Sequence, residues 1–350
     1  MTQLTPRQQN ILDFIGQRGE ATNQEILAEL EKKGDLISRE TLVRELNALA
    51  ERNAIAKTGK GRGVTYSAKN AHPLLVPLDV EKYLTQEVDI RAPKPILFNF
   101  EILSRIEGTF TPAEITELNA ENEVYQKRVG ALSPALLSKE LERVTIELSW
   151  KSSKIEGNTY TLLDTESLIK EHKEAVGHTK EEAAMILNHK KALDHILGSK
   201  NKLKALSLRA IEDVHRLLVD GLNVNFGLRS RAVGITGTAY RPLDNKHQIT
   251  EAMEKAVMEI NKMEDAWNKA LTALLLIAYI QPFEDGNKRA SRLLANACLL
   301  AHDACPLSFR SIDETEYKKA LTVFYELNNA TLMKKLFIEQ WCFAVQNYFV

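Results

Sequence analysis

The sequence predicts a mainly α-helical protein in which a small α+β domain precedes a larger helical core. Three observations lead to this fold class. The chain has 350 residues, more than a single hydrophobic core usually organises, so we expect two domains. Its first part shows three helical segments followed by two short β-like runs. Its second part repeats apolar residues at helical spacing almost throughout.

The N-terminal domain, expected over residues 1–70, has the pattern of a winged helix. Residues 6–18 carry apolar side chains at helical spacing. A second helix is expected from Asn23 to Gly34, because glycine commonly ends a helix, and a third opens with Ser38 as its N-cap. The stretch AIAKTGKGRGVTYSAK then predicts two strands around a basic turn, which would form the wing.

A winged helix usually binds DNA by placing its third helix in the major groove and its wing along the backbone. The residues expected to face base edges are Arg39, Thr41 and Arg44. The wing cations expected to meet phosphates are Lys57, Lys60 and Arg62. Acidic residues on the third helix partly cancel these charges, so a protein-docking or dimerisation module, and with it a homodimer, stays open as the alternative.

Residues 71–95 are expected to be a linker, since the periodicity fades there and prolines recur. The helical core then extends over residues 96–350. Its predicted helices span 111–128, 133–156, 164–175, 180–198, 207–220, 249–263, 266–280, 287–302, 313–327 and 331–349. One segment interrupts this pattern: residues 226–247 combine β-branched residues, glycines and a proline, and predict a β-hairpin flap.

Composition excludes several classes of protein. The net charge of -1 argues against a uniformly basic nucleic-acid coat, although a local basic patch remains compatible with it. The longest apolar run, ALTALLLIAYI from Ala270, is too short to span a bilayer and suits a buried helix. The N-terminus does not resemble a secretion signal, and the three cysteines lack disulfide or zinc spacing. We therefore expect a cytoplasmic protein without a membrane partner.

The stretch QPFEDGNKRASR, residues 281–292, carries the densest chemistry. A helix is expected to start at Asn287, where free backbone N–H groups attract anions. Arg289 and Arg292 are three residues apart and share a helix face, so two guanidinium groups could hold one polyphosphate. Asp285 offers an oxygen ligand for magnesium. An ordinary solvated helix start is the alternative, because Asp-Gly-Asn is common turn chemistry.

The complete string resembles the signature of the Fic (filamentation induced by cAMP) family. That signature runs His-Pro-Phe, any residue, Asp or Glu, Gly-Asn-Gly-Arg, two residues, Arg. The residues that match in register are Pro282, Phe283, Asp285, Gly286, Asn287, Arg289 and Arg292. The likeness extends over most of residues 95–350, where HKKALDHIL, IEDVHRLLVDGL and GLRSRAVGITGTAYRPL are similar to the helices and flap that precede the signature.

The resemblance implies a helical Fic core that transfers AMP from ATP-magnesium to a Ser, Thr or Tyr hydroxyl of a protein. It implies that Asp285 holds the magnesium ion. The residues implied to cradle the α and β phosphates are Gly286, Asn287 and Lys288. Arg289 and Arg292 would clamp the β and γ phosphates.

The flap is implied to dock the protein target. An exposed strand edge would accept a segment of the target by backbone pairing, with Gly237, Thr238 and Tyr240 at the docking position. A simple surface hairpin is the alternative.

The stretch SSKIEGN, residues 152–158, resembles the inhibitory motif of this family, with Ser152, Glu156 and Gly157 at the matching positions. This implies an inhibitory helix over residues 133–157. Glu156 would pair with Arg292 and occupy the position of the γ-phosphate, so ATP would bind poorly until the helix moves. The alternative is an exposed glutamate before a helix-ending glycine.

Gln281 departs from the family, because it stands where the signature has its histidine. A carboxamide cannot take up the hydroxyl proton, and losing a general base typically costs about 10²- to 10⁴-fold in rate. Transfer should therefore be weak or absent. Three explanations stay open: the glutamine was introduced deliberately, the native protein senses nucleotide without catalysis, or another group acts as base. His215 and His247 are the nearest spare histidines, the first expected to be packed and the second solvated.

Lys288 is the second departure, since the signature has glycine there. The Doc toxins, relatives that transfer phosphate instead of AMP, share this lysine, so a Doc-like protein kinase remains an alternative. A catalytically silent, ATP-binding transcriptional regulator is another. Arg292 and the motif around Glu156 favour the AMP-transferring branch.

Overall fold

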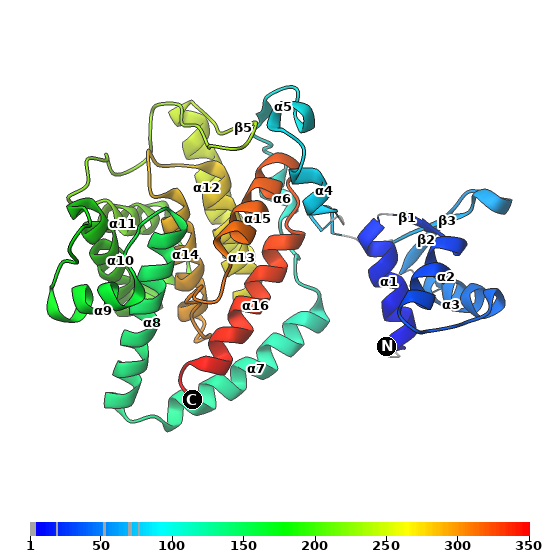
Figure 1. The fold of residues 1–350 in the computed structure, drawn as a ribbon, viewed down its shortest axis with the longest axis horizontal. Helices are drawn as coiled ribbons and strands as arrows, with labels where there is room; N and C mark the ends of the chain where they lie inside the picture. The colour runs from blue at the N-terminus through cyan, green and yellow to red at the C-terminus, as the bar shows by residue number, and fades with distance from the viewer. Residues whose placement is uncertain (1–4, 19, 52–53, 69–71, 76–77) are drawn as a thin grey trace. The chain divides into compact units, whose positions relative to one another are not determined.

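The computed structural model describes residues 5–18, 20–51, 54–68, 72–75 and 78–350. It divides the chain into two compact units, residues 1–87 and 88–350 (Figure 1). The boundary falls inside the predicted linker 71–95, of which residues 71, 76 and 77 lie outside the described part. Two short helices that the sequence did not predict lie on either side of this boundary: α4 (Val80–Leu84) and α5 (Val88–Arg91).

The N-terminal unit is a winged helix, as predicted. Its helices are α1 (Pro6–Arg18), α2 (Asn23–Lys32) and α3 (Arg39–Glu51). Its strands are β1 (Glu20–Thr22), β2 (Ile55–Thr58) and β3 (Thr65–Ala68). They form an antiparallel sheet in the order β1-β3-β2, in which β3 pairs with both neighbours. The strand β1 was not predicted, because it has only three residues.

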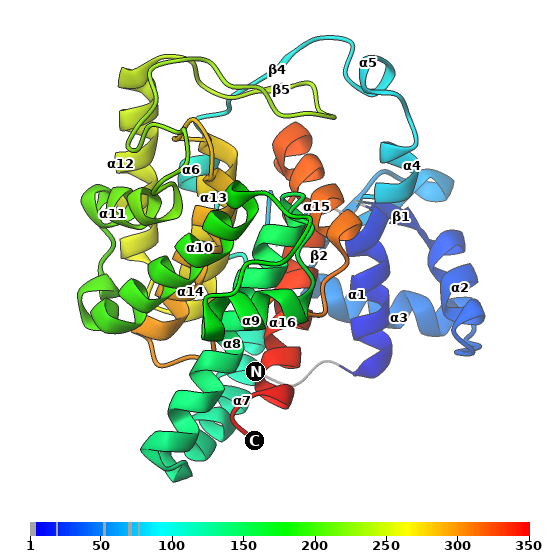
Figure 2. The ribbon, with the colours of Figure 1, turned by 60° about the vertical axis from the view of Figure 1, so that its left-hand side comes forward.

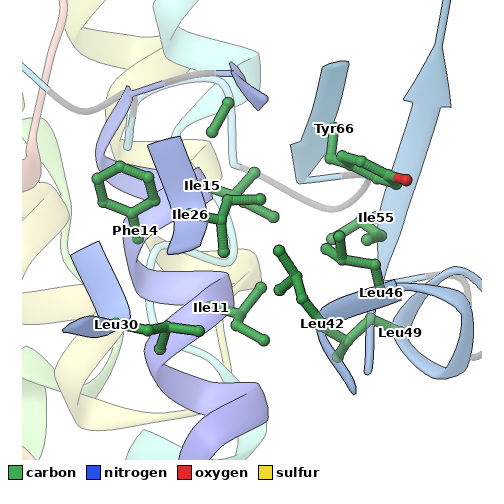
Figure 3. Packing of buried hydrophobic residues seen from close by; sticks show 11 residues of the cluster. Ile11, Phe14, Ile15, Ile26, Leu30, Leu42, Leu46, Leu49, Ile55 and Tyr66 are labelled. Atoms are coloured by element: carbon green, nitrogen blue, oxygen red, sulfur yellow. The ribbon is translucent and has the colours of Figure 1, made fainter. Parts of the chain in front are cut away.

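One hydrophobic core holds this unit together. Ile11 and Ile15 of α1 pack with Ile26 of α2, with the apolar face of α3, and with Ile55 and Tyr66 from the sheet (Figure 3). Thr22 caps α2 because its side chain accepts a hydrogen bond from the backbone N–H of Glu25, while the Glu25 carboxylate accepts one from the backbone N–H of Thr22. Three helices and a short sheet thus share a single core.

The second unit is mostly helical. Apart from the short α6, which was not predicted, its helices lie close to the predicted ranges, and the largest difference is that α9 ends at Glu171 instead of residue 175. They are α6 (Ile102–Arg105), α7 (Pro112–Ala131), α8 (Pro134–Ile155), α9 (Leu162–Glu171), α10 (Lys180–Ser199), α11 (Leu208–Leu218), α12 (Lys246–Lys262), α13 (Ala266–Ile280), α14 (Asn287–Ala301), α15 (Glu314–Leu327) and α16 (Thr331–Asn347). A short 3₁₀ helix, η2 (Lys200–Lys204), follows α10.

The centre of this unit is α13. Every residue of α13 is buried, and α12, α14 and α15 pack around it (Figure 1). The helix α14 in turn contacts α8, α10 and α11. The loop between α13 and α14, residues 281–286, is therefore held by two buried helices.

The predicted hairpin over residues 226–247 is wrong. The one strand there is β5 (Tyr240–Arg241), which pairs in parallel with β4 (Ile96–Leu97) from the start of the unit (Figure 2). Two backbone groups of this segment, which would pair with a second strand in a hairpin, instead form hydrogen bonds with side chains. The backbone N–H of Ala239 donates to Glu326, and the Arg231 carbonyl accepts from the Arg229 guanidinium. The flap is consequently an irregular loop.

The described helices include none that combines the length and the apolar character needed to cross a lipid bilayer.

Candidate functional site

The site begins where α13 ends. Gln281 caps this helix in the left-handed conformation with φ of 51°, which is uncommon for a residue with a side chain. The buried Arg229 holds it there, because its Nε donates to the Gln281 carbonyl at 2.6 Å. The other two guanidinium nitrogens donate to the carbonyls of Arg231 and Leu243. Arg229 therefore ties the flap loop to the end of α13.

The loop is closed by the Asn287 side chain. Its Oδ1 accepts from the Phe283 N–H at 2.8 Å, and its Nδ2 donates to the Phe283 carbonyl at 2.9 Å. The Phe283 ring is buried and stacks on the His215 imidazole at 3.7 Å between ring centroids. The resemblance implied that Asn287 cradles phosphates, but its amide group is already used within the loop. Its backbone N–H belongs to the first turn of α14, where no acceptor lies within the helix.

Gly286 starts α14 in the left-handed conformation, with φ of 79°. A side chain there would be strained, and it would lie close to Arg289 and His215. The bare backbone leaves the positive end of the helix open to an anion.

Arg289 and Arg292 project from the first turns of α14 and are almost fully buried, at 2% and 0% exposure. Arg289 Nη2 donates to Asp285 Oδ2 at 3.0 Å, whereas its Nη1 has no hydrogen-bond partner among the described residues. Arg292 Nε donates to Ser152 Oγ at 2.9 Å, and its Nη2 donates to the Ser152 carbonyl at 2.8 Å. Both guanidinium groups are thus fixed in place before any ligand binds.

Glu156 is the C-cap of α8, and each of its carboxylate oxygens accepts from a different cation. Arg292 Nη2 donates to Oε1 at 2.9 Å, and Lys288 Nζ donates to Oε2 at 3.0 Å. Burial alone would raise the pKa of Glu156, but Arg292 and Lys288 outweigh it and hold this pKa below its usual value. The Glu156–Arg292 contact predicted from sequence is present, and Lys288 adds a second contact that was not predicted.

A cavity of about 510 Å³ opens beside these groups. The predicted site residues that line it are Glu156, Gly157, Gln281, Asp285, Gly286, Asn287, Lys288 and Arg289. Ser152 and Arg292 lie behind Glu156 and do not line it. The remaining walls come from Ile155, Glu284, flap residues 233–236 and the α15 residues Lys318, Leu321, Thr322 and Tyr325.

The α15 wall was not predicted as part of the site. Its lining residues recur at spacings of three and four, so they share one helix face. This spacing does not indicate a binding site, because any amphipathic helix has residues that share a face. Arg229 was missed for a different reason: nothing in the sequence distinguishes an arginine that bonds buried carbonyls from one on the surface.

The predicted docking residues of the flap differ in exposure: Gly237 is exposed, Thr238 is half-buried and Tyr240 is buried. Tyr240 is buried, its ring stacks on Tyr279, and its hydroxyl donates to the Tyr279 carbonyl at 2.7 Å. The Gly237 carbonyl accepts from Arg91, and Thr238 Oγ1 accepts from the Tyr240 N–H. The placement of Tyr240 near an exposed tip was therefore wrong, because a large aromatic side chain stabilises more by packing than by facing solvent.

Proton acceptors are scarce at Gln281. Its Nε2 donates to the Ala278 carbonyl at 2.6 Å, so the side chain turns back onto its own helix. His215 is packed, as expected, with its Nε2 against the Asp285 carbonyl at 2.9 Å. Burial lowers the pKa of His215 to about 4. His247 is exposed, also as expected.

Asp285 is the one predicted metal ligand. In the described part of the chain, no three His, Cys, Asp or Glu side chains gather as a metal site would require. Magnesium commonly uses one or two carboxylates together with substrate phosphates. A largely exposed Asp285 at the cavity wall fits an ion delivered with a nucleotide better than a resident metal.

The predicted DNA-contacting residues lie on the N-terminal unit. Arg39 and Arg44 of α3 and Lys57 and Lys60 of the wing are exposed. Thr41 is half-buried, and its hydroxyl lies 3.2 Å from Ser38 Oγ at the start of α3. The side chain of Arg62 lies outside the described part.

Comparison with known proteins agrees with this architecture. Residues 205–299 match the Fic/DOC family, and residues 4–121 match the penicillinase repressor family. A relative from Nematostella vectensis named protein adenylyltransferase Fic is 25% identical over 190 residues, which cover 49% of this chain and 41% of the relative. The chain thus matches about two fifths of that relative's length.

Two solved structures are similar. A Fic family protein from Desulfovibrio desulfuricans is 25% identical, with a TM-score of 0.55 over 68% of this chain and 74% of its own. Fic-1 from C. elegans is 17% identical, with a TM-score of 0.59 over 93% of this chain and 87% of its own, a likeness in fold. The helical unit therefore contains a Fic/DOC domain over residues 205–299, and the winged helix lies within the residues that are similar to penicillinase repressors.

Proposed function

We propose that the helical unit binds magnesium-ATP in the cavity beside α14 and transfers AMP to a hydroxyl group of another protein. The observation that carries this proposal is the position of Glu156, whose carboxylate is held by Arg292 and Lys288 at the wall of the cavity. A carboxylate so placed uses the donors that a phosphate oxygen would use. The name of the Nematostella vectensis relative points to AMP as the group transferred.

The transfer joins the oxygen of the target hydroxyl to the α-phosphorus. The bond from this phosphorus to the oxygen that bridges to the β-phosphate breaks, and pyrophosphate leaves. The backbone N–H groups at the start of α14, together with Arg289, would stabilise the charge that develops on the phosphate oxygens. Asp285 would hold the magnesium ion, which neutralises phosphate charge when bound.

The target would approach along the flap. Residues 233–236 line the cavity and are irregular, so a segment of the target could pair with their backbone next to the α-phosphate. This edge replaces the position near Tyr240, which is buried.

Glu156 acts as a lock in this proposal. Arg292 cannot engage a phosphate while it bonds Glu156 and Ser152, and Lys288 is held by the same carboxylate. ATP binding therefore needs the last turn of α8 to move. Because the lock is a local ion pair, the movement is reversible.

Gln281 makes the present chain a poor catalyst. The hydroxyl proton needs an acceptor, and an amide that donates to the Ala278 carbonyl is not a base. Nucleotide binding should survive, because the phosphate-binding groups do not include the Gln281 side chain.

Labelled ATP tests the activity. Two variants, Glu156→Gly and Glu156→Gly with Gln281→His, are incubated with a cell lysate and ATP labelled at the α or the γ phosphate. We expect α-label on protein about 10² to 10⁴ times faster with the histidine. Adding Arg289→Ala to the variant that carries Glu156→Gly and Gln281→His should abolish the labelling. γ-label would indicate a protein kinase instead, and no label with the histidine present would overturn the enzymatic proposal.

A second candidate function is a DNA-binding regulator whose Fic domain senses ATP. It is favoured by the match of residues 4–121 to the penicillinase repressor family and by the exposed cations on α3 and the wing. Fluorescence anisotropy with duplex DNA, with and without magnesium-ATP, tests it. DNA affinity that responds to the nucleotide in the Gln281 form supports a sensor, and no DNA binding at low salt contradicts it.

A further inference from the structure

Tyr325 is a buried residue of the cavity wall that the mechanism above does not use. It lies on α15, is 2% exposed, and lines the cavity together with Gln281, Glu156 and Arg289. Its ring stacks on Tyr240 at 5.6 Å between centroids and 17° between planes. The ring is therefore fixed by packing, and the direction of the hydroxyl is fixed with it.

The hydroxyl of Tyr325 makes no well-formed hydrogen bond with any described residue. Its nearest partner is the Gln281 side chain, which forms a weak hydrogen bond with it that falls short of good geometry. Buried tyrosine hydroxyls usually find a partner, because leaving one unpaired destabilises the folded protein. Phenylalanine would pack equally well here without that cost.

A second donor at the same cavity is also unpaired. Arg289 Nη1 is buried and lacks a partner among the described residues, while its Nη2 bonds Asp285. Two unsatisfied donors in one cavity call for a ligand with several acceptor oxygens, and a phosphate chain has them. The Glu156 carboxylate lines the same cavity and holds the cations that such a chain would bind.

We propose that Tyr325 is a ligand-binding residue whose hydroxyl donates a hydrogen bond to a phosphate oxygen of the bound nucleotide, next to the position that Glu156 holds in the locked protein. This inference rests on the proposed function. It assigns one residue of the α15 wall, Tyr325, to the phosphate chain, where its hydroxyl contributes to affinity.

The protonation state of Tyr325 agrees with a donor role. Burial raises the pKa of Tyr325 well above its usual value, and the charges of Glu156 and Arg292 also act on it. The phenol stays protonated at neutral pH, so it can donate a hydrogen bond but cannot serve as the missing base. A Tyr325→Phe substitution therefore removes one bond to the ligand and no acid–base group.

The test uses the full chain carrying Glu156→Gly, with and without Tyr325→Phe. Calorimetry measures the affinity for magnesium-ATP and for magnesium-tripolyphosphate, and thermal unfolding measures the ligand-free protein. We expect Tyr325→Phe to weaken both affinities about tenfold, as for the removal of a hydrogen bond to a charged group. The unfolding temperature of the ligand-free protein should stay the same or rise, because an unpaired buried hydroxyl is removed.

Tyr348→Phe is the matched control. Tyr348 is also buried, but its hydroxyl bonds Glu147 and Ser308 away from the cavity. This variant should unfold at a lower temperature and keep its affinity, the reverse of Tyr325→Phe.

Three results would overturn the inference. Unchanged affinity with a lower unfolding temperature would make the Tyr325 hydroxyl structural. A loss with ATP but not with tripolyphosphate would place the bond on the nucleoside. No binding of either ligand by Glu156→Gly itself would overturn the proposed function, and this inference with it.

Discussion

The two units of the chain carry their positive charge in opposite ways. In the helical unit, Arg229, Arg289 and Arg292 are almost completely buried and bonded to named oxygens. In the winged helix, Arg39, Arg44, Lys57 and Lys60 are exposed. One set is organised before a ligand arrives, whereas the other can adjust to its partner.

This difference indicates what each unit can recognise. Buried guanidinium groups in fixed positions suit a small polyanion of defined shape, because little side-chain freedom has to be lost on binding. Exposed cations suit a long polyanion such as DNA, where the attraction is diffuse and weakens with salt. The buried set should also stabilise the fold, whereas the exposed set should not.

The largest expected effect is on stability. Arg229→Met removes three hydrogen bonds, to the carbonyls of Gln281, Arg231 and Leu243, and leaves these carbonyls without their donor. We expect a loss of about 3 kcal/mol or more in the free energy of unfolding, measured with urea. The exposed Arg44→Ala should change it by no more than about 0.5 kcal/mol. Equal effects would contradict the contrast between the two sets.

The next effect concerns DNA. Replacing both Arg39 and Arg44 by alanine should weaken binding to a mixed-sequence duplex on the order of tenfold at physiological salt. It should also make the dependence of log affinity on log salt shallower by about 0.9 for each phosphate that the protein no longer neutralises. Arg209→Ala, an exposed cation of the helical unit, is the control and should change neither. A salt dependence that the double variant leaves intact would move the interface elsewhere.

The smallest expected effect is that of Lys288→Ala on the affinity for magnesium-ATP, which should be opposite in the locked and the unlocked protein. Its ammonium bonds Glu156 in the locked protein and would meet a phosphate in the unlocked one. Lys288→Ala should therefore raise the affinity for magnesium-ATP by about threefold in the wild-type chain and lower it by about threefold in Glu156→Gly, as expected for a partly exposed ion pair. Calorimetry on the four proteins measures both. The same sign in both backgrounds would show that Lys288 does not serve both roles.

Helix positions were predictable because their signals are local. The apolar periodicity predicted α13 and α14 to within one residue at each end, and the order of elements predicted the winged helix. The contact between Glu156 and Arg292, which are 136 residues apart, came from the resemblance to a family and not from periodicity.

The flap and the α15 wall could not be predicted in this way. Whether residues 226–247 form a hairpin depends on the hydrogen bonds that the side chains of Arg229 and Glu326 make with the backbone of this segment. These are tertiary contacts, which local sequence patterns do not predict. Tyr325 faces the cavity because of the way in which α15 packs against α13. The sequence of α15 shows which residues share a face, but it does not show which element that face contacts.

The central claim is that the loop after α13 binds a magnesium-bound triphosphate and that Glu156 blocks it. Calorimetric titration of magnesium-ATP into the wild-type chain and Glu156→Gly tests it most directly, with Glu284→Gln as a control that neutralises a cavity carboxylate not bonded to Arg292. We expect Glu156→Gly to bind at least about tenfold more tightly than the wild type, a gain of about 1.4 kcal/mol, and Glu284→Gln to bind like the wild type. Absence of binding to Glu156→Gly, or equal gains in both variants, would contradict the account.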